Sequence, residues 1–507
     1  MTTTIQDGQL GNGLPRLSWS VVGVGAIVFA VLMALAGKYG FHRDELYFLD
    51  AGRHLQGGYV DQPVLGPLLA RASLDLFGVS LVGLRIWPAL IAWLTVVVAG
   101  LITRECGGGG RSQLLAATGV ATMPVLLAVD HLEGPTSVDV LAWAALALVV
   151  LRIGRTRDYR WWLVAGAVLG VGLTNKHSIG IFAVAIVVGA LLSRGTRDIA
   201  NRWFVGGAML AAMFVVPDLV WQAGHGWATV TMTRELNSEN GGLGNLPGWV
   251  VGQLLMSTLV FVPVWFAGLR TLWRSSVALW RALAWAYGVL FVVYGLTTGG
   301  QIYYLAGAYV YLLAVGAIRL DAWLSGHRAR AAVMLACAVV STASAVVIVL
   351  PVLPAADIGW TYGVNQAPGE SIGWPEFVDQ VRSAWLAIPP ATRANAVIFT
   401  ADYGEAGAIN ELGRGTGLPT AVSGDNNEWW WGPGNPDATT VLAVAPGPVD
   451  VTDYDSYLRQ YFGQVEDVAT LRNSAGIHNE EWDGHLYLCT RPIRPWSQLW
   501  PVFRHYG

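Results

Sequence analysis

The chain has 507 residues, of which 54% are hydrophobic and only 13% are charged. An ordinary soluble domain carries about 25% charged residues, so this composition indicates a polytopic membrane protein. The net charge of −3 gives no basis for nucleic-acid binding, and the three cysteines lie too far apart to form a disulfide framework or a zinc-ligand pattern.

Apolar stretches predict the membrane spans. About eleven of them approach the length of roughly 20 residues that a membrane-spanning helix needs. They cover residues 18–37, 83–103, 113–129, 137–152, 161–175, 178–193, 203–221, 249–269, 278–297, 303–319 and 331–351. The fifth and sixth stretches are short, so we expect a hairpin of abbreviated helices there. The fold is therefore predicted to be mainly α, a polytopic helical bundle.

The arginines alternate between connections, which predicts the orientation of the spans. With the N-terminus in the cytoplasm, the even-numbered connections face inward, as the positive-inside rule requires. Those connections and the adjoining span ends hold Arg104, Arg111, Arg152, Arg155, Arg157, Arg160, Arg194, Arg197, Arg202, Arg270, Arg274, Arg281, Arg319, Arg328 and Arg330, whereas the outward connections 130–136 and 298–302 hold no arginine. Residues 38–82 and the tail after about residue 352 are then extracytoplasmic, in a multi-pass plasma-membrane protein.

The first apolar stretch has an alternative interpretation as a secretory signal. Ala34-Leu35-Ala36 has the small-x-small pattern of a cleavage site, although the apolar run is long for a signal peptide. Removal of this segment would leave the outward placement of residue 41 onward unchanged.

The first outward loop combines charges with apolar and aromatic side chains directly after a span. Residues 41–63 are FHRDELYFLDAGRHLQGGYVDQP. Carboxylates so close to a membrane are costly unless they pair or bind something, so Asp44 and Glu45 are candidate functional residues. An ordinary solvated loop with scattered ion pairs is the alternative. Residues 64–80 are amphipathic and are predicted to lie along the interface as a helix.

Further polar residues fall on the next outward connections. Residues 131–140, HLEGPTSVDV, bring His131, Glu133 and Asp139 to the start of the fourth span, where capping of the helix by Thr136 or Ser137 is an alternative.

The turn TNKHS at 174–178 holds Lys176, one of only two lysines in the chain. This lysine could hold a phosphate as a point charge or snorkel to the membrane surface. The long loop 222–248 holds His225, and long loops are often functional lids. Tyr303 lies where GGQIYY opens the tenth span, and an aromatic belt is the alternative role for it.

The tail has a different pattern, with short strands and helices in place of long apolar stretches. Strands are predicted at 397–400, 420–423 and 439–446, with a helix at about 404–412. Residues 353–507 are therefore predicted to form a small extracytoplasmic α/β domain, and residues 1–352 the membrane domain. The segment Trp429-Trp430-Trp431 suits stacking on sugar rings, anchoring at the membrane surface, or packing.

The order and sidedness of these segments resemble the GT-C class of polytopic glycosyltransferases. The closer resemblance is to the branch of dolichyl-phosphate-mannose-protein mannosyltransferases and lipid A aminoarabinose transferases. It rests on the Asp44-Glu45 pair with YFLDAGRHLQGGYVDQP, and on PTSVDVLAW, GLTNKHSIG, WQAGHGW and GGQIYYLAGAYVYLL. The tail segment YGEAG, residues 403–407, also resembles a segment of many bacterial members.

The resemblance covers nearly the whole membrane part and implies a function. Members of this class move a sugar from a polyprenyl-phosphate carrier to an acceptor on the extracytoplasmic face, with inversion expected for this branch. By the same resemblance, Asp44 is the catalytic acid/base with Glu45 beside it, and Asp139 matches the acid that opens the fourth span.

One motif departs from the family. The pattern of an acid, a lysine and two prolines falls on Asp61-Gln62-Pro63-Val64, so Gln62 replaces a lysine that contacts carrier phosphate in the aminoarabinose branch. Lys176, Arg43, Arg85 or a metal would then supply the positive charge.

Sugar transfer of this kind needs a base and a phosphate clamp. A carboxylate that takes the acceptor's proton contributes about 10²–10⁴-fold, and a cation stabilises the charge that grows on the leaving phosphate. The candidates for contacting donor, acceptor or metal are Asp61, Asp139, His225, His131, Glu133 and Tyr303. A divalent metal is the only cofactor considered, with Asp61 and His225 as candidate ligands. An ordinary loop histidine is the alternative for His225.

Two other functions fit part of the pattern. A transporter or flippase of a lipid-linked saccharide would hold its binding residues near the bilayer midplane, whereas the acids here cluster in outward loops. A non-catalytic membrane protein that binds cell-wall polymer through its tail would not need Asp44. The sequence specifies neither the sugar nor the acceptor, which could be a glycan, a glycolipid or a protein.

Overall fold

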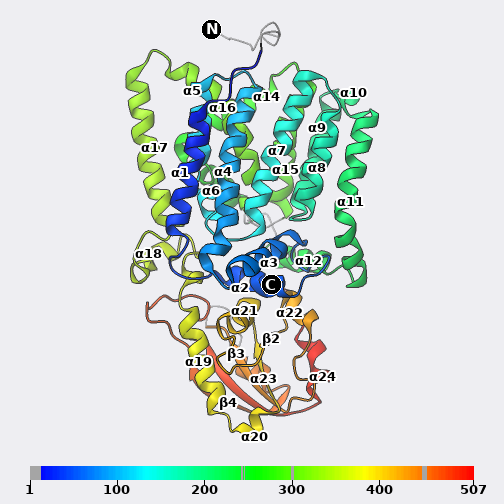
Figure 1. The fold of residues 1–507 in the computed structure, drawn as a ribbon, viewed down its shortest axis with the longest axis vertical. Coiled ribbons are helices and arrows are strands. Elements are labelled where there is room, and N and C mark those ends of the chain that lie inside the picture. The colour runs from blue at the N-terminus through cyan, green and yellow to red at the C-terminus, as the bar shows by residue number, and fades with distance from the viewer. Residues whose placement is uncertain (1–12, 241–243, 245, 298–301, 448–453, 507) are drawn as a thin grey trace.

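The computed structural model describes residues 13–240, 244, 246–297, 302–447 and 454–506. It consists of a helical bundle, a layer of short helices and a domain built on a five-stranded sheet (Figure 1). The helix α1 begins at the end of the bundle that lies opposite the sheet domain. Which end faces the cytoplasm stays a prediction.

Every predicted apolar stretch contains helix. The bundle helices are α1 (Trp19–Leu35), α4 (Leu81–Glu105), α5 (Gly110–Ala121), α6 (Pro124–Val129), α7 (Pro135–Thr156), α8 (Trp161–Leu173), α9 (Ser178–Leu192), α11 (Arg202–Gly224), α13 (Leu246–Leu255), α14 (Val262–Trp273), α15 (Ala278–Thr297), α16 (Ala306–Leu324) and α17 (Arg328–Val349). The short α10 (Thr196–Ile199) lies between α9 and α11.

Six of the described helices are long and apolar enough to cross a membrane, and α1, α8 and α9 are shorter apolar helices. A seventh span results if α13 and the segment Leu259–Trp273, which are bent by 83°, are counted together. The polytopic helical fold and the hairpin of short helices α8 and α9 are thus confirmed, although fewer than eleven helices reach full spanning length.

Two predicted stretches are broken, and a proline lies in the first turn of the helix that follows each break. Within 113–129, α5 ends at Ala121 and α6 begins at Pro124, because proline lacks the N–H that a continuing helix would need. Within 249–269, Thr258 adopts a positive φ of 60°, and Pro263 falls in the first turn of α14. A single straight helix was therefore the wrong prediction for each.

Glycines let the bundle helices approach closely. A Cβ at Gly268 of α14 would lie 2.0 Å from the Leu312 carbonyl oxygen, and one at Gly316 of α16 would lie 2.0 Å from that of Val264. Small residues at helix contacts are the usual device in membrane bundles, where close packing replaces the hydrophobic effect.

The middle layer holds the first outward loop. It contains α2 (Arg43–Arg53), α3 (Leu65–Phe77) and α12 (Ala228–Asn240). The helix α3 confirms the amphipathic helix predicted at 64–80. The loop predicted at 222–248 is wrong in its middle, because residues 228–240 contain no glycine or proline and form α12.

The tail forms a mixed sheet of order β2-β1-β3-β5-β4. Its strands are β1 (Ala396–Thr400), β2 (Val422–Ser423), β3 (Thr440–Ala445), β4 (Phe462–Thr470) and β5 (His485–Pro492). The strand β1 runs parallel to β2 and β3, whereas β5 is antiparallel to β3 and β4. The three predicted strands are found, and β4 and β5 were not predicted. The helices of this region are α18 (Gly359–Tyr362), α19 (Trp374–Ala387), α20 (Pro390–Arg393), α21 (Tyr403–Leu412), α22 (Asn426–Trp431), α23 (Tyr454–Leu458) and α24 (Trp496–Leu499).

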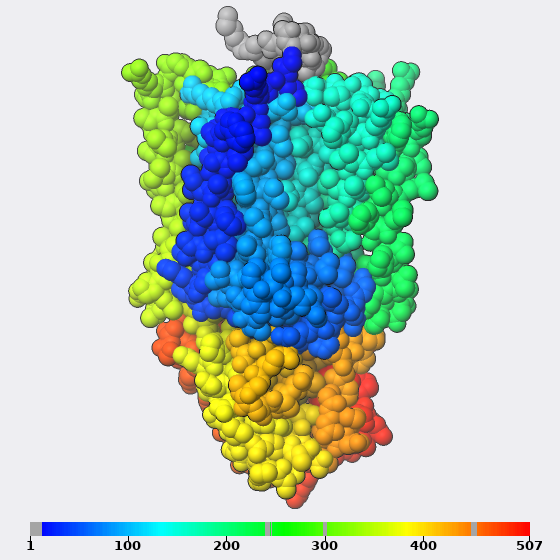
Figure 2. Space-filling model, viewed as in Figure 1, coloured from blue at the N-terminus to red at the C-terminus, as the bar shows by residue number. Residues whose placement is uncertain are grey.

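The tail packs directly against the middle layer. In Figure 2 the blue surface of the first loop meets the gold and orange surface of the tail without a gap. This contact joins α2 to α21 and brings residues from the two ends of the sequence together.

Candidate active site

Asp44 lies in the first turn of α2, whose start is fixed by a capping box. The His42 ring accepts a hydrogen bond from the Asp44 amide, and the Glu45 carboxylate accepts one from the His42 amide. The Asp44 side chain is 42% exposed. Its Oδ1 accepts a hydrogen bond of 2.9 Å from the hydroxyl of Tyr403, which belongs to the tail, and lies 3.8 Å from Nε of Arg43. Asp44 is therefore held in place with part of its carboxylate accessible.

Glu45 has the opposite environment. Its fully buried carboxylate forms a bidentate pair with Arg85, at 2.9 Å and 2.8 Å, and also accepts the Glu133 amide at 3.0 Å. Burial acts to raise the pKa of Glu45, but Arg85 and the hydrogen bonds outweigh it, so that this pKa lies below its ordinary value. Glu45 is therefore fully paired and shielded from any substrate.

Arg85 uses its remaining donors on the backbone. It donates to the carbonyls of Ala36 at 2.9 Å and Gly40 at 2.7 Å, and so ties the end of α1 to α2. Arg43 is likewise engaged, in an ion pair with Glu480 of the tail. The geometry favours positioning roles for Glu45, Arg85 and Arg43 over the substrate contacts predicted for them.

Lys176 and Asp139 come together with Tyr303. Lys176 Nζ lies 5.1 Å and 5.0 Å from the ring centroids of Tyr303 and Tyr304, and it donates to Thr136 Oγ1 at 3.3 Å. Burial lowers the pKa of Lys176, and nearby Asp139 opposes this effect. No acid in the described part of the chain forms an ion pair with Lys176, so its ammonium can serve an anionic ligand.

Asp139 itself is held rigidly. Its Oδ1 accepts hydrogen bonds from Ser178 Oγ at 2.7 Å and from Trp143 Nε1 at 3.1 Å. Tyr303 is within electrostatic range of Asp44, which links this group to the start of α2. The first three residues of the predicted motif at 299–304 fall in 298–301, outside the described residues.

Asp61 and Gln62 follow α2 in the same loop. Tyr47 donates a hydrogen bond of 2.7 Å to Asp61 Oδ1. Burial raises the pKa of Asp61 to about 6, although the Tyr47 hydrogen bond acts to lower it. The Gln62 side chain is 2% exposed, and neither its Nε2 nor its Oε1 has a hydrogen-bond partner among the described residues. A buried amide without partners is costly, so Gln62 has unused capacity for a ligand.

His131 and Glu133 lie behind Glu45, in the connection between α6 and α7. Burial lowers the pKa of His131 to about 3 and raises that of Glu133 well above its ordinary value. Asp130, which the sequence did not single out, is 1% exposed, and neither carboxylate oxygen has a partner in the described structure. These groups form a buried polar layer beneath α2.

His225 packs among aromatic rings. Its ring lies 3.9 Å from the Trp221 ring and 4.7 Å from that of Trp430, and its Nδ1 lies 2.7 Å from the Trp221 carbonyl oxygen. The metal pair of Asp61 and His225 stays a prediction. The one group of three potential ligands that the described residues contain lies elsewhere.

The tail contributes Tyr403, which the sequence analysis did not identify as a site residue. A Cβ at Gly404 would lie 2.6 Å from Arg43 Cβ, and one at Gly407 would lie 2.7 Å from the Leu46 carbonyl carbon. These two glycines let α21 approach α2 closely enough for Tyr403 to reach Asp44. The spacing of three residues between glycines on a predicted helix was the available signal.

Two of the three adjacent tryptophans, Trp430 and Trp431, pack between the tail and the membrane part, whereas Trp429 packs within the tail. Trp431 stacks on His54 at 4.4 Å, Trp430 contacts His225, and Trp429 donates to the Trp500 carbonyl at 3.1 Å. Of the three roles considered for this segment, packing is the one that these contacts favour.

These features define a membrane protein of GT-C fold, with a half-exposed aspartate at the first loop and a sheet domain docked on it. The resemblance predicted from the sequence is confirmed. Residues 61–221 match the family model described as dolichyl-phosphate-mannose-protein mannosyltransferase. That match begins at Asp61 and does not include Asp44.

The chain is also similar to a galacturonosyltransferase and to solved structures of ArnT. The chain is 24% identical over 312 residues to the lipopolysaccharide core galacturonosyltransferase RgtB of Rhizobium johnstonii, covering 61% of this chain and 62% of the relative. The chain thus spans less than two thirds of that relative's length. The fold is similar to ArnT from Cupriavidus metallidurans bound to undecaprenyl phosphate, with a TM-score of 0.61 at 13% identity, covering 92% of this chain and 97% of ArnT. The apo state of ArnT gives a TM-score of 0.58 at 15% identity.

Proposed function

We propose that the protein transfers a sugar from a polyprenyl-phosphate carrier to an acceptor hydroxyl at the extracytoplasmic face of the plasma membrane. The reaction is a direct displacement with inversion, and Asp44 is the base. The N-terminus faces the cytoplasm and the tail domain lies outside.

The contrast within the Asp44-Glu45 pair carries this proposal. Glu45 is fully buried and saturated by Arg85, whereas the neighbouring Asp44 is 42% exposed. A base must reach the proton that it abstracts, and Asp44 alone of the two can do so. The tail's Tyr403 orients the carboxylate by donating to Oδ1, which leaves Oδ2 to accept a proton.

The proposed step balances in one displacement. The acceptor oxygen attacks the anomeric carbon while its proton passes to Asp44. The bond between the anomeric carbon and the phosphate oxygen breaks, and the polyprenyl phosphate leaves with the electron pair. An effect of about 10²–10⁴-fold is typical for such a base.

Lys176 is the group best suited to the leaving phosphate. It has no acid partner among the described residues and is packed against two tyrosine rings, which hold the ammonium in place. Gln62 adds an unpartnered amide that could donate to a phosphate oxygen. A cation aimed at growing negative charge stabilises the transition state without the cost of reorganisation.

The isoprenoid tail of the carrier requires apolar surface next to this cation. The helix α11 exposes Met209, Met213, Val216 and Val220. Its Asp218 accepts a hydrogen bond of 2.9 Å from His177, which adjoins Lys176. We place the carrier along α11, with its phosphate at the turn that holds Lys176.

The similar proteins support the substrate class. ArnT was solved with undecaprenyl phosphate, and RgtB is described as acting on lipopolysaccharide core. By analogy with these two proteins, we propose that the donor is a polyprenyl-phosphate sugar and the acceptor is a cell-envelope glycan.

Reconstitution in vesicles tests the function. Purified protein is supplied with polyprenyl-phosphate sugars labelled in the sugar, and with envelope glycan fractions on the tail side. The expected result is a covalent glycan product together with free polyprenyl phosphate. Label that crosses the bilayer while still attached to its carrier would instead support a flippase.

A further inference from the structure

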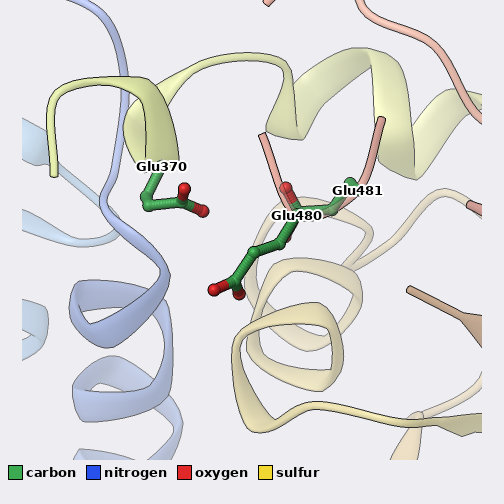
Figure 3. A group of neighbouring side chains, drawn as sticks. All are labelled: Glu370, Glu480 and Glu481. Atoms are coloured by element: carbon green, nitrogen blue, oxygen red, sulfur yellow. The ribbon is translucent and has the colours of Figure 1, made fainter. Parts of the chain in front are cut away.

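Three glutamates from distant segments meet beside α2, outside the proposed active site. Glu370 belongs to the short 3₁₀ turn Gly369–Ser371, and Glu480 and Glu481 belong to the loop between β4 and β5. One carboxylate oxygen from each residue lies within 4.8 Å of the other two. Figure 3 shows the Glu370 carboxylate pointing toward that of Glu480.

The Glu370 side chain is buried, and half of its carboxylate has no partner. Only 5% of the residue is exposed. Its Oε1 accepts a hydrogen bond of 2.5 Å from Tyr362, whereas its Oε2 has no hydrogen-bond partner among the described residues. Oε2 of Glu481 is buried and unpartnered in the same way. Buried carboxylates are normally paired or bound to metal, so these oxygens are candidates to bind a cation.

Negative charge is concentrated around the cluster. Arg43 pairs with Glu480. Asp402 and Glu405 add negative charge close by, and their carboxylates cap the start of α21. The cluster therefore lies in a region that holds five carboxylates.

We propose that Glu370, Glu480 and Glu481 bind a calcium ion. An all-oxygen ligand set suits hard cations and not zinc or copper. Calcium tolerates irregular geometry and completes its six to eight ligands with water or carbonyl oxygens, whereas magnesium needs a near-ideal octahedron. The ion fastens the segment before α19 to the β4–β5 loop. Through Glu480 and Arg43 it also fixes the residue next to Asp44.

Thermal unfolding of the full-length protein in nanodiscs tests this proposal. After removal of divalent ions with a chelator, millimolar Ca²⁺ should raise the Tm by about 3 °C or more at about pH 8. Magnesium at the same concentration should give a smaller shift than calcium.

Matched variants locate the ion. Glu370→Gln and Glu481→Gln should each abolish the calcium-dependent shift, whereas Glu466→Gln, on the exposed face of β4, should retain it. Equilibrium dialysis of the wild-type protein with ⁴⁵Ca²⁺ should find one tightly held ion per chain, which keeps the test valid if a variant fails to fold. The proposal would be overturned if calcium did not change the Tm of the wild-type protein at about pH 8, or if Glu370→Gln kept the full calcium-dependent shift in Tm. Neither readout depends on sugar transfer.

Discussion

Acidic side chains are paired differently at the two ends of the bundle. At the end with the arginine-rich connections, Glu105 pairs with Arg155 at 2.5 Å, Asp198 with Arg157 at 2.5 Å, and Asp321 with Arg111 at 3.2 Å. At the end that meets the tail, Glu45 with Arg85 is the one ion pair among the described residues in which both side chains are fully buried.

This difference separates paired acids, which stabilise the fold, from unpaired polar groups, which are candidates for function. Removing one partner of a buried pair leaves an uncompensated charge, so paired acids hold the fold. The unpaired groups at the tail end, including Asp130, Gln62 and one oxygen of Asp218, are buried without partners in the described structure. Such groups are expensive to keep and are typical of binding or catalytic sites.

Breaking the Glu45–Arg85 pair should have the largest effect on stability. Arg85→Gln leaves Glu45 charged and buried, and should lower the free energy of unfolding by about 3–5 kcal/mol. Arg71→Gln, which removes an exposed pair with Asp75, should cost at most about 1 kcal/mol. Denaturant unfolding measures both, and equal losses would show that the pair is not the anchor of the first loop.

Removing the unpaired cation should impair transfer and leave stability nearly intact. Lys176→Gln should slow sugar transfer by about 10²–10³-fold, because the leaving phosphate loses its charge partner. The only other lysine provides the control, since Lys38 is exposed and Lys38→Gln should transfer at the wild-type rate. Normal turnover by Lys176→Gln would show that Lys176 does not stabilise the leaving phosphate.

The contact from the tail should matter less. Tyr403→Phe deletes the hydrogen bond to Asp44 and leaves the ring packed against Tyr47 at 4.8 Å. Loss of one hydrogen bond to a charged group predicts a decrease of about tenfold in turnover, with carrier binding unchanged. Stopped-flow turnover alongside carrier titration checks both parts, and full activity would limit the tail to a structural role.

The hydrogen bond from Tyr47 should set the acid limit of activity. If transfer requires ionised Asp61, activity falls as the pH drops through about 6. The Tyr47 hydroxyl acts to lower this pKa, so Tyr47→Phe should move the acid limb of the pH–rate profile upward by about one pH unit. If the acid limb of the Tyr47→Phe profile does not move while the alkaline limb also stays unchanged, the ionisation of Asp61 does not limit the rate.

The arginine-rich end should give the smallest effect. Arg111 is 54% exposed, so Arg111→Gln should change the free energy of unfolding by at most about 1 kcal/mol and leave transfer unchanged. A large loss of transfer would mean that the two ends are not functionally distinct.

Local patterns predicted much of the fold. The apolar stretches located the bundle helices, amphipathic spacing located α3, and β-branched runs located β1 and β3. The breaks in 113–129 and 249–269 lie before helices with a proline in the first turn, and a count of hydrophobic residues does not register such breaks.

The site was harder to predict, because its decisive contacts join distant residues. The sequence placed Asp44 and Glu45 side by side, but only the pairing of Glu45 with Arg85, forty residues away, separates their environments. Tyr403 lies 359 residues from Asp44, and no local pattern records that contact. The unpartnered state of Gln62 and Asp130 is likewise a property of the packed structure.

The most direct test of the central claim separates chemistry from binding at Asp44. Single-turnover transfer and the Kd for polyprenyl phosphate are measured for Asp44→Asn, with Asp75→Asn as the control on the exposed face of α3. The account predicts a loss of about 10²–10⁴-fold in the transfer rate of Asp44→Asn, with an unchanged Kd and a normal rate for Asp75→Asn. Transfer at the wild-type rate by a folded Asp44→Asn protein would contradict it.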